Sequence, residues 1–580
     1  MLRSLIRCGA LAGVVVLGAC DLIVQNPNSP ETARVLARPL DAEVLLGAQY
    51  LRWHGALYGT LSNVWGMAAV QSFEDFSSLA NNGMGARLSI PRPSNDNAIG
   101  NGFATEQRSV FYTMAEVDRT STNILNKFAD PTFTLGVPGQ NARDNRAEAF
   151  AHFMRALSVG YAALFYDSVA VVRADMGPQD PGLLVGYQEA MDSALVDFQN
   201  AIDHATVPPI GADGFPIPSG WIPSATALSA TEFVKLVRSY RAKFRASVAR
   251  TPAERAAVNW AAVIADAQAG ITADFQLVTN TTNGPFNSWL SQFYSFSTWH
   301  QMSPFVLGMA DGSDGAYAAW IAQSVNDRGG SGGFFMVSPD RRFPQGATRP
   351  LQQADFDKTA CGGAAQICKH YFTNRASGSD QLAGAGWGFS NYDHVRFWSW
   401  RNSGDAGSAR NGKLTYFTKA ELDMLQAEGL IRTGSYAAAA ALINLTRTAC
   451  GIPAVQPCTA NANGQPGGNL PAITVFDNTS PVPGGADCVP KIPVGPNYNT
   501  VACGNLFEAM KYEKRIETAY SNFAAWFLDM RGWGDLSEGT GLDWAAPYED
   551  LAARGRTGTA IYSTGGVGGY HSAAKGTYGW

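Results

Sequence analysis

The sequence has little charge, and it lacks the features that would direct a chain to nucleic acid or through a membrane. Only 16% of its 580 residues are charged, and the formal net charge is −5. Binding to a phosphate backbone needs a basic footprint, which argues against nucleic acid as the main partner. No run of about 18 or more apolar residues occurs, so we predict no membrane-spanning helix. With 46% hydrophobic residues, the composition is instead that of a folded protein with a sizeable core.

Sequence motifs for metal binding and for nucleophilic catalysis are also missing. The histidines form no H-E-x-x-H pattern and no C-x-x-C is present, so we expect no metal site and no cofactor. Residues Gly329–Gly333 match G-x-S-x-G only as a glycine tract, since no buried strand precedes them. Residues Asp311–Gly315 lack the distal glutamate of a calcium loop, and we interpret them as a turn.

The first 20 residues have the composition of an export signal. Arg3 and Arg7 form a basic start, and the apolar run that follows is too short to span a bilayer. The run ends in Leu17-Gly18-Ala19-Cys20, which resembles a bacterial lipobox and predicts cleavage before Cys20 and acylation of that residue. Several acyl chains anchor a protein stably, so we expect a lipid-anchored envelope protein. The alternative is an ordinary signal peptide cut near Ala19, with Cys20 a plain cysteine.

Six further cysteines lie in the second half of the chain. An oxidising envelope favours disulfides between them. Their order suggests three local loops, closed by Cys361–Cys368, Cys450–Cys458 and Cys488–Cys503. Such bonds would close long loops, where loop closure costs entropy. The alternative is a zinc site, but no histidine lies at ligand spacing from two of the cysteines.

Helical periodicity dominates the first half of the mature chain and returns near its end. The spacing of apolar residues predicts helices over 106–128, 144–168, 187–204, 229–249, 253–270, 415–432, 435–448 and 504–530. An earlier helix would begin with Asp41 as its cap. Residues 276–412 are rich in Gly, Ser, Asn and aromatic residues, and helical periodicity there is weak. Long irregular segments inside a compact protein are usually functional.

These patterns predict five segments and a fold class. The segments are a lipoprotein signal peptide (1–19), an N-terminal helical region (20–275), a loop-rich insertion that forms the ligand-binding face (276–412), a C-terminal helical region with a Cys/Pro/Gly-rich insertion at 451–503 (413–535), and a Gly-rich tail (536–580). Gly434 at a turn and Tyr436 at the start of the next helix are typical of a tetratricopeptide-type helix pair. Stacked pairs form a solenoid, so we predict a mainly α, tetratricopeptide-like helical superhelix with long irregular loop insertions.

Four stretches of sequence together carry a resemblance to a known family. They are Asp21–Pro30 with Asp41–Glu43 and Gly47–Tyr50; Arg146–Ala149 with Arg155–Leu157 and Phe165–Asp167; Ala427–Leu430 with Leu442–Arg447 and Gly451–Pro453; and Glu513–Glu517 with Asp529–Gly534. In this order, behind a lipobox, they resemble the SusD/RagB family of outer-membrane nutrient-binding lipoproteins. One departure is Gly429, where the family usually has alanine inside a helix; glycine there costs about 1 kcal/mol.

The resemblance implies a fold, a location and a partner. The fold is a right-handed superhelix of tetratricopeptide-like units. The location is the outer membrane, with a lipid anchor and with the protein facing the cell exterior. The partner is a TonB-dependent, SusC-like outer-membrane transporter. The protein would bind a nutrient, an oligosaccharide or polysaccharide, and hand it to the transporter; a peptide ligand is also compatible with the sequence.

Aromatic side chains in the loop-rich insertion are the candidates for contact with a glycan. Aromatic faces suit the axial C–H groups of sugars, and planar polar side chains suit their hydroxyls. A strand over 395–400 would place Arg396, Trp398 and Trp400 on one face. The predicted ligand-binding residues are Trp289, Tyr294, Trp299, Trp387, Arg396, Trp398 and Trp400. Packing of these side chains onto the helices is the alternative for each of them, and it is our interpretation of His300 and His394.

Two other functions are weighed against ligand capture. Glu513, Glu517 and Asp529 could supply a carboxylate pair for glycoside hydrolysis. The interleaved Arg515 and Arg531 would hold both carboxylates ionised, whereas hydrolysis needs one raised pKa. We therefore interpret these residues as ion pairs that hold the last helix, and we expect no enzymatic activity. The remaining alternative is an envelope scaffold that uses its helices for protein contacts alone.

Overall fold

The structure is a computed structural model, and helices predominate in it. It describes residues 35–58, 64–77, 87, 89–102, 105–136, 142–177, 180–208, 214–280, 300–313, 315–323, 335–355, 370–374, 392–397, 411–449, 468–521, 524–556 and 562–580. Every sheet among these residues has two short strands. No helix in the described ranges has the length and apolar character needed to cross a membrane.

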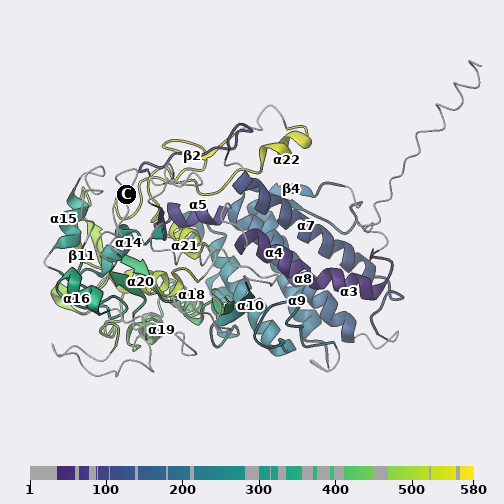
Figure 1. Cartoon of the computed structure of the whole chain (residues 1–580), viewed down its shortest axis with the longest axis horizontal. Coiled ribbons are helices and arrows are strands. Elements are labelled where there is room, and N and C mark those ends of the chain that lie inside the picture. The colour runs from purple at the N-terminus through teal and green to yellow at the C-terminus, as the bar shows by residue number, and fades with distance from the viewer. Residues whose placement is uncertain are drawn as a thin grey trace, which may run out of the picture.

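The first half of the chain is mainly helical, and its helices α3, α4, α7, α8 and α9 lie side by side at one end of the molecule (Figure 1). The helices of this half are α3 (Pro39–Gly47), α4 (Gln49–Tyr58), α5 (Val64–Gln71), α7 (Thr105–Phe128), α8 (Ala142–Phe165), α9 (Tyr187–Ala205), α10 (Ala230–Ser247), α11 (Pro252–Ala256) and α12 (Trp260–Gln268). The antiparallel strands β3 (Ser168–Val171) and β4 (Leu183–Gly186) follow α8. Helix α8 packs against α7 and α9, and α9 packs against α10.

The middle of the chain contains short strands and helices. They are β5 (Phe275–Asn280), β6 (His300–Gln301), α14 (Pro304–Leu307), the 3-10 helix η2 (Gly308–Ala310), α15 (Ala316–Ala322), α16 (Arg349–Ala354), β7 (Phe372–Asn374), β8 (Tyr392–His394) and β9 (Asn411–Phe417). Strand β5 pairs with β9, and β7 pairs with β8. Strand β6 pairs with β1 (Phe76–Ser77), which follows α5 in the chain.

The last part of the chain returns to helices and ends in a tail of turns. Its elements are α18 (Lys419–Arg432), α19 (Tyr436–Arg447), η6 (Gly485–Asp487), β10 (Lys491–Val494), β11 (Thr500–Cys503), α20 (Leu506–Thr518), α21 (Ala525–Trp533), α22 (Tyr548–Ala553) and β12 (Thr564–Gly565). Strand β12 pairs with β2 (Ser94–Asn95), so the tail returns to the N-terminal half. The division into five segments stays a prediction.

Most of the predicted helices are confirmed, with instructive exceptions. Helices α7, α8, α9 and α10 match their predicted ranges closely, and Ser229 begins α10 with a capping box that includes Glu232. The predicted helix over 253–270 is two helices, because Asn259 caps a new one at Trp260. Asp41 caps nothing: the N-cap of α3 is Arg38, and Asp41 lies in the first turn.

Two further differences concern the C-terminal helices. The predicted helix over 415–432 begins only at Lys419, because 411–417 form strand β9. The predicted helix over 504–530 is broken into α20 and α21, and Tyr520 (φ 59°) and Ala524 (φ 53°) take left-handed conformations between them. Neither residue is glycine or proline, so no composition signal marks this break.

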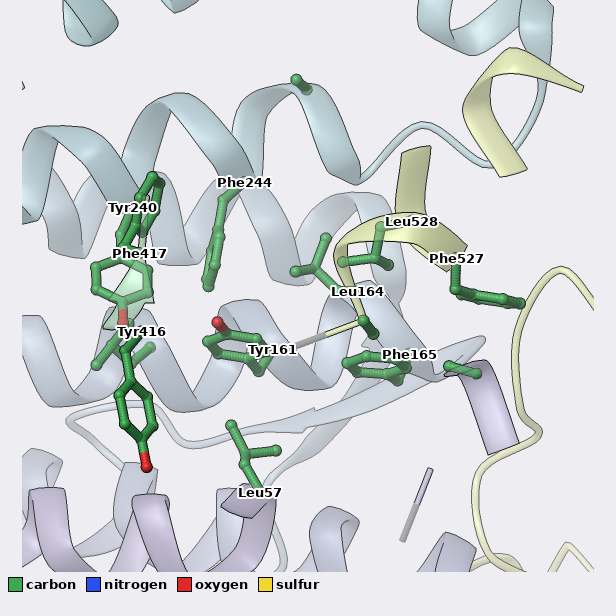
Figure 2. Close-up of a cluster of buried hydrophobic side chains, with 14 of the residues drawn as sticks. Leu57, Tyr161, Leu164, Phe165, Tyr240, Phe244, Tyr416, Phe417, Phe527 and Leu528 are labelled. Atoms are coloured by element: carbon green, nitrogen blue, oxygen red, sulfur yellow. The ribbon is translucent and has the colours of Figure 1, made fainter. Parts of the chain in front are cut away.

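One hydrophobic core joins the two halves of the molecule. Figure 2 shows Tyr161 of α8 and Phe244 of α10 lying beside Tyr416 and Phe417 of β9 and Leu528 of α21. All five side chains are buried, and they belong to a single cluster that runs from Leu36 to Trp580. The core therefore connects the N-terminal helices to segments that lie some hundreds of residues later in the chain.

The disulfide framework is described in part. Cys488 and Cys503 form a disulfide with a Cα–Cα distance of 5.8 Å, as predicted. It joins the residue after η6 to the end of β11. Cys20, Cys361, Cys368, Cys450 and Cys458 lie outside the described residues, so acylation and the other two pairings stay predictions.

Candidate functional site

One of the seven predicted ligand-binding residues, Arg396, lies in the described part of the chain. The other six (Trp289, Tyr294, Trp299, Trp387, Trp398 and Trp400) lie outside it. The structure does, however, place the points at which their segments join the described chain. Residues 281–299 lead directly into β6, 375–391 lead into β8, and 398–410 begin after Phe397, close to the end of β8. Strands β6 and β8 contact each other, so these three junctions lie close together.

Arg396 is held by contacts within the protein. Strand β8 ends at His394, and residues 396 and 397 form a turn, so the strand expected over 395–400 does not form in the described residues. Arg396 Nη1 donates to the Glu517 carbonyl oxygen at 2.9 Å and lies 3.5 Å from Glu517 Oε2. Its guanidinium also covers the ring of Tyr371, 4.5 Å from the centroid. The side chain thus fastens the segment after β8 to α20, and its contact with a ligand stays a prediction.

His394 packs against rings on several elements. Its ring centroid lies 4.8 Å from that of Tyr520 and 5.5 Å from those of Phe372 and Phe397. Burial, with a smaller effect of the nearby Arg396, holds the pKa of His394 well below its usual value, so the imidazole is neutral. The interpretation of His394 as a packed residue agrees with this environment.

Acidic side chains are buried around Tyr520, where the turn after α5 meets β8. Burial first, and then the charges of Asp75, Asp393 and Glu74, raise the pKa of the Tyr520 hydroxyl well above its usual value. We call Glu74, Asp75, Asp393, His394 and Tyr520 the polar floor. Glu74 and Asp75 directly precede β1, and Asp393 and His394 belong to β8. Tyr520 contacts Glu74 and His394. The polar floor therefore lies next to the junctions of the three aromatic segments.

Glu74 is the most unusual member of the polar floor. Its side chain is fully buried, and one carboxylate oxygen accepts a hydrogen bond from the Tyr520 amide at 2.9 Å. The other oxygen has no hydrogen-bond partner among the described residues. Burial, followed by the charge of Asp75, raises the pKa of Glu74 to about 8. Phe73, next to it, and Tyr520 both have positive φ, of 63° and 59°. The sequence did not indicate this residue, because its burial depends on segments far apart in the chain.

The carboxylates considered for hydrolysis are engaged in ion pairs. Arg342 Nη1 lies 2.7 Å from Glu513 Oε2 and 3.0 Å from Glu517 Oε1. Lys514 Nζ lies 2.7 Å from Asp529 Oδ2. These contacts confirm the predicted role of the acidic residues in holding the last helices.

The two arginines of the same motif behave differently from each other. Arg515 pairs with the fully buried Asp535. Arg531 donates to three carbonyl oxygens, those of Leu164, Ser247 and Leu542, at 2.7–2.9 Å. Two of those carbonyls end α8 and α10, where the helix dipole favours a cation. Arg531 therefore departs from the predicted ion pairing.

The described residues provide no cluster of metal ligands, and Asp311 organises a turn. Within the described ranges, no group of three or more His, Cys, Asp and Glu residues could hold a metal ion. Asp311 accepts hydrogen bonds from the amides of Ser313, Tyr317 and Val337, which agrees with the predicted turn.

A cavity of about 360 Å³ opens between α9, α10 and α11, with Met191, Leu195, Val248 and Val258 among its lining residues. The periodicity of the sequence could not reveal this cavity, because its lining residues have the same spacing as the buried residues of any helix.

Comparison with known proteins places the fold. No family model and no curated protein matches this sequence. B. fragilis NanU is similar in structure, with a TM-score of 0.50 and 13% identity over 93% of this chain and 99% of that one.

Two further solved structures are similar at lower scores. A SusD-like carbohydrate-binding protein from Bacteroides fragilis NCTC 9343 has a TM-score of 0.46 and 14% identity, over 94% of this chain and 97% of that one. A SusD superfamily protein from Bacteroides vulgatus ATCC 8482 has a TM-score of 0.46 and 12% identity, over 89% and 90%. The chain shares the fold of B. fragilis NanU, and this fold has the mainly α, tetratricopeptide-like character that the sequence predicts.

Proposed function

We propose that the protein is a lipid-anchored outer-membrane protein that binds an oligosaccharide or polysaccharide outside the cell and hands it to a TonB-dependent, SusC-like transporter. The observation that carries this proposal is the agreement in fold with B. fragilis NanU along nearly the whole of both chains. The four family-like sequence stretches and the lipobox at Cys20 support it from the sequence.

The ligand site lies where the aromatic segments join β6 and β8. Trp289, Trp299, Trp387, Trp398 and Trp400 all belong to segments whose junctions lie close together. A cluster of indole rings suits the apolar C–H faces of sugar rings. Arg396 contributes by holding the segment after β8 against α20.

The environment of the acidic residues favours ligand binding without catalysis. Glycoside hydrolysis needs one carboxyl group with a raised pKa beside an ionised one, with room for the sugar between them. Glu513 and Glu517 are buried and held by Arg342, and Asp529 is held by Lys514 and Arg255. These carboxylates are therefore engaged in the fold.

Glycan binding is tested with purified protein that lacks the signal peptide (residues 21–580). Native gels that contain a panel of bacterial and plant polysaccharides should retard this protein. Trp289→Ala and Trp398→Ala should weaken the retardation, whereas Tyr112→Ala, a control at a tyrosine on α7 with 37% exposure, should not. A protein that no polysaccharide retards argues against glycan binding. Normal retardation of both tryptophan variants would show that the site is misplaced.

Anchoring and the transporter partner need a separate test in cells. Labelling with a fatty-acid analogue should mark the full chain and not Cys20→Ala, and the variant should leave the outer-membrane fraction. Detergent extracts of the wild-type protein should contain a TonB-dependent β-barrel. Co-purification with that barrel, without any binding to glycan, would favour the scaffold function instead.

A further inference from the structure

The cavity between α9, α10 and α11 shares no lining residue with the proposed glycan site. Its volume of about 360 Å³ falls in the range of small-molecule sites. Met191 is buried, whereas Leu195, Val248 and Val258 pack on the core and stay partly exposed. These four residues come from α9, the end of α10 and the turn after α11. An apolar group in the cavity would therefore contact apolar side chains from all three elements.

Two charged side chains of the same lining carry groups that no residue in the described ranges engages. Asp192, an exposed residue of α9, makes no hydrogen bond and no ion pair there. Arg245 of α10 donates from Nε to Asp266 Oδ2 at 3.1 Å, and its Nη1 and Nη2 make no hydrogen bond to a described residue. The lining thus offers one carboxylate and one partly used guanidinium beside apolar surface.

Positive charge is in excess around Arg245. Arg238, Arg241 and Arg245, which we call the arginine cluster, follow at helical spacing on α10, and all pair with the one carboxylate of Asp266 on α12. Like charges three and four residues apart on a helix repel, and one acid does not balance three guanidiniums. Arg241 uses its last nitrogen, Nη1, for Gln199 at 2.7 Å. An anion bound by the free nitrogens of Arg245 would offset the remaining positive charge.

The second acid of the lining, Glu254, already has partners. Its carboxylate accepts hydrogen bonds from the Tyr187 hydroxyl at 3.1 Å and from the Arg250 amide at 2.8 Å. Tyr187 begins α9, whereas the arginine cluster meets α9 further along, at Gln199. Glu254 therefore lies toward the start of α9 and Arg245 toward the arginine cluster. A carboxylate held by Arg245 would be on the side of the cavity away from Glu254.

We infer that this cavity binds a small zwitterion with an apolar side chain, namely an apolar free amino acid. The carboxylate of the ligand pairs with Nη1 and Nη2 of Arg245, and its ammonium group pairs with Asp192. Its side chain packs on Met191, Leu195 and Val258. A guanidinium binds a carboxylate through two parallel hydrogen bonds, and an acid without the ammonium group would bring a like charge to Asp192. This inference goes beyond glycan capture and does not rest on it.

Isothermal titration calorimetry on residues 21–580 tests the inference with L-leucine, L-methionine and L-phenylalanine, which should all bind. Two analogues of leucine each lack one charge: isocaproate has no ammonium group, and isoamylamine has no carboxylate. Each should bind at least about 10-fold more weakly than leucine, because hydrogen bonds to charged groups contribute that much. Asp192→Asn and Arg245→Gln should weaken the binding of leucine to a similar extent.

Two matched controls separate the cavity from its surroundings. Glu189→Gln changes another exposed acid of α9, and Arg238→Gln removes another partner of Asp266; neither residue lines the cavity. Both variants should bind leucine as the wild type does. Urea unfolding confirms that each variant is folded, and Asp192→Asn, at an exposed position, tests the site even if Arg245→Gln does not fold.

The outcomes bear on this cavity and leave the glycan site to its own test. Absence of binding for all three amino acids overturns the inference, whatever the polysaccharide gels show. Unchanged affinity in Asp192→Asn, or an equal loss in Arg238→Gln and Arg245→Gln, overturns it as well. Loss of leucine binding in Trp289→Ala, with Asp192→Asn unaffected, would place the amino acid at the aromatic segments and overturn the cavity site.

Discussion

Arg255 binds both carboxylate oxygens of Glu428, although 173 residues separate the two in the chain. Arg255 Nε lies 3.0 Å from Oε1 and Nη2 lies 2.6 Å from Oε2, and neither side chain is exposed. Nη2 also lies 3.1 Å from Asp529 Oδ1. Burial alone would raise the pKa of Glu428, but the charges of Arg255 and Arg432 outweigh it and lower the pKa to about 2. The pair therefore joins α11 to α18 and α21 as ionised groups.

Removal of one partner from this buried pair should be strongly destabilising. Glu428→Gln leaves the Arg255 charge without its bidentate acceptor, and we expect a loss of about 3–5 kcal/mol in the free energy of unfolding. Urea unfolding followed by circular dichroism measures this loss. The matched control is Glu116→Gln, since the Arg52–Glu116 pair has side chains 54% and 53% exposed. Exposed pairs contribute little, about 1 kcal/mol at most. Equal losses in the two variants would contradict the structural role of the buried pair.

Gly429 should be needed for the contact between α12 and α18. A Cβ at this position would lie 2.9 Å from Ile264 Cγ1 and 3.2 Å from Trp260 Cε3. Alanine favours a helix by about 1 kcal/mol over glycine, but overpacking typically costs 1–3 kcal/mol. We expect Gly429→Ala to be destabilising by about 1 kcal/mol.

The control for that prediction lies in another helix. A Cβ at Gly55, on the exposed side of α4, would meet nothing within 4 Å. We therefore expect Gly55→Ala to be stabilising by up to about 1 kcal/mol. The two alanine substitutions should thus shift the urea midpoint in opposite directions, and shifts of the same sign would refute the close-contact argument.

The sequence was informative where local periodicity decides the structure. The apolar residues of α8, among them Phe150, Phe153 and Leu157, face the core. Because one face of the helix is buried, these residues recur at helical spacing, and that spacing predicts the helix. Likewise, the arginines interleaved with the acids of α20 and α21 predict ion pairs, and Glu513 and Glu517 are paired, although their partner is the distant Arg342. The cysteines at 488 and 503 were paired correctly because they are neighbours in order along the chain.

Features that arise from tertiary contacts were not predictable. From the sequence, Gly429 is only a departure from the family pattern that lowers helix propensity. In the structure it lies against α12, a helix that is distant in the chain. Alternation along the sequence predicts a strand face for Arg396, but β8 ends at His394 and Glu517 of α20 lies beside the arginine instead. The burial of Glu74 comes from Tyr520, 446 residues later, so no local pattern could reveal its raised pKa.

The disulfide between Cys488 and Cys503 should stabilise the segment around β10 and β11. It spans 15 residues, and closing a loop of that size in the unfolded chain contributes about 3 kcal/mol. Cys488→Ala combined with Cys503→Ala should lose about that amount in urea unfolding. Peptide mapping without reductant should recover the two cysteines as a linked pair. Recovery of either cysteine linked to Cys450 or Cys458 instead would contradict this connectivity.

Glu74 should make the protein less stable as the pH rises. Its pKa is about 8 in the folded protein against an ordinary value of 4.5, because burial disfavours the charged form. Between these values the folded protein keeps a proton that the unfolded chain releases, so stability falls with rising pH. Above pH 8 the cost is complete, and at about 1.4 kcal/mol per pKa unit it amounts to a few kcal/mol.

Glu74→Gln removes this titration while keeping an acceptor for the Tyr520 amide. We expect the variant to match the wild type near pH 4.5 and to exceed its free energy of unfolding by a few kcal/mol at pH 8.5, because the amide carries no charge to bury. Urea unfolding at both pH values measures the difference. Glu116→Gln, at an exposed position, should show no such divergence. If Glu74→Gln follows the wild type across the whole range, the carboxylate is ionised in the folded protein, and an unseen cation or water must compensate its charge.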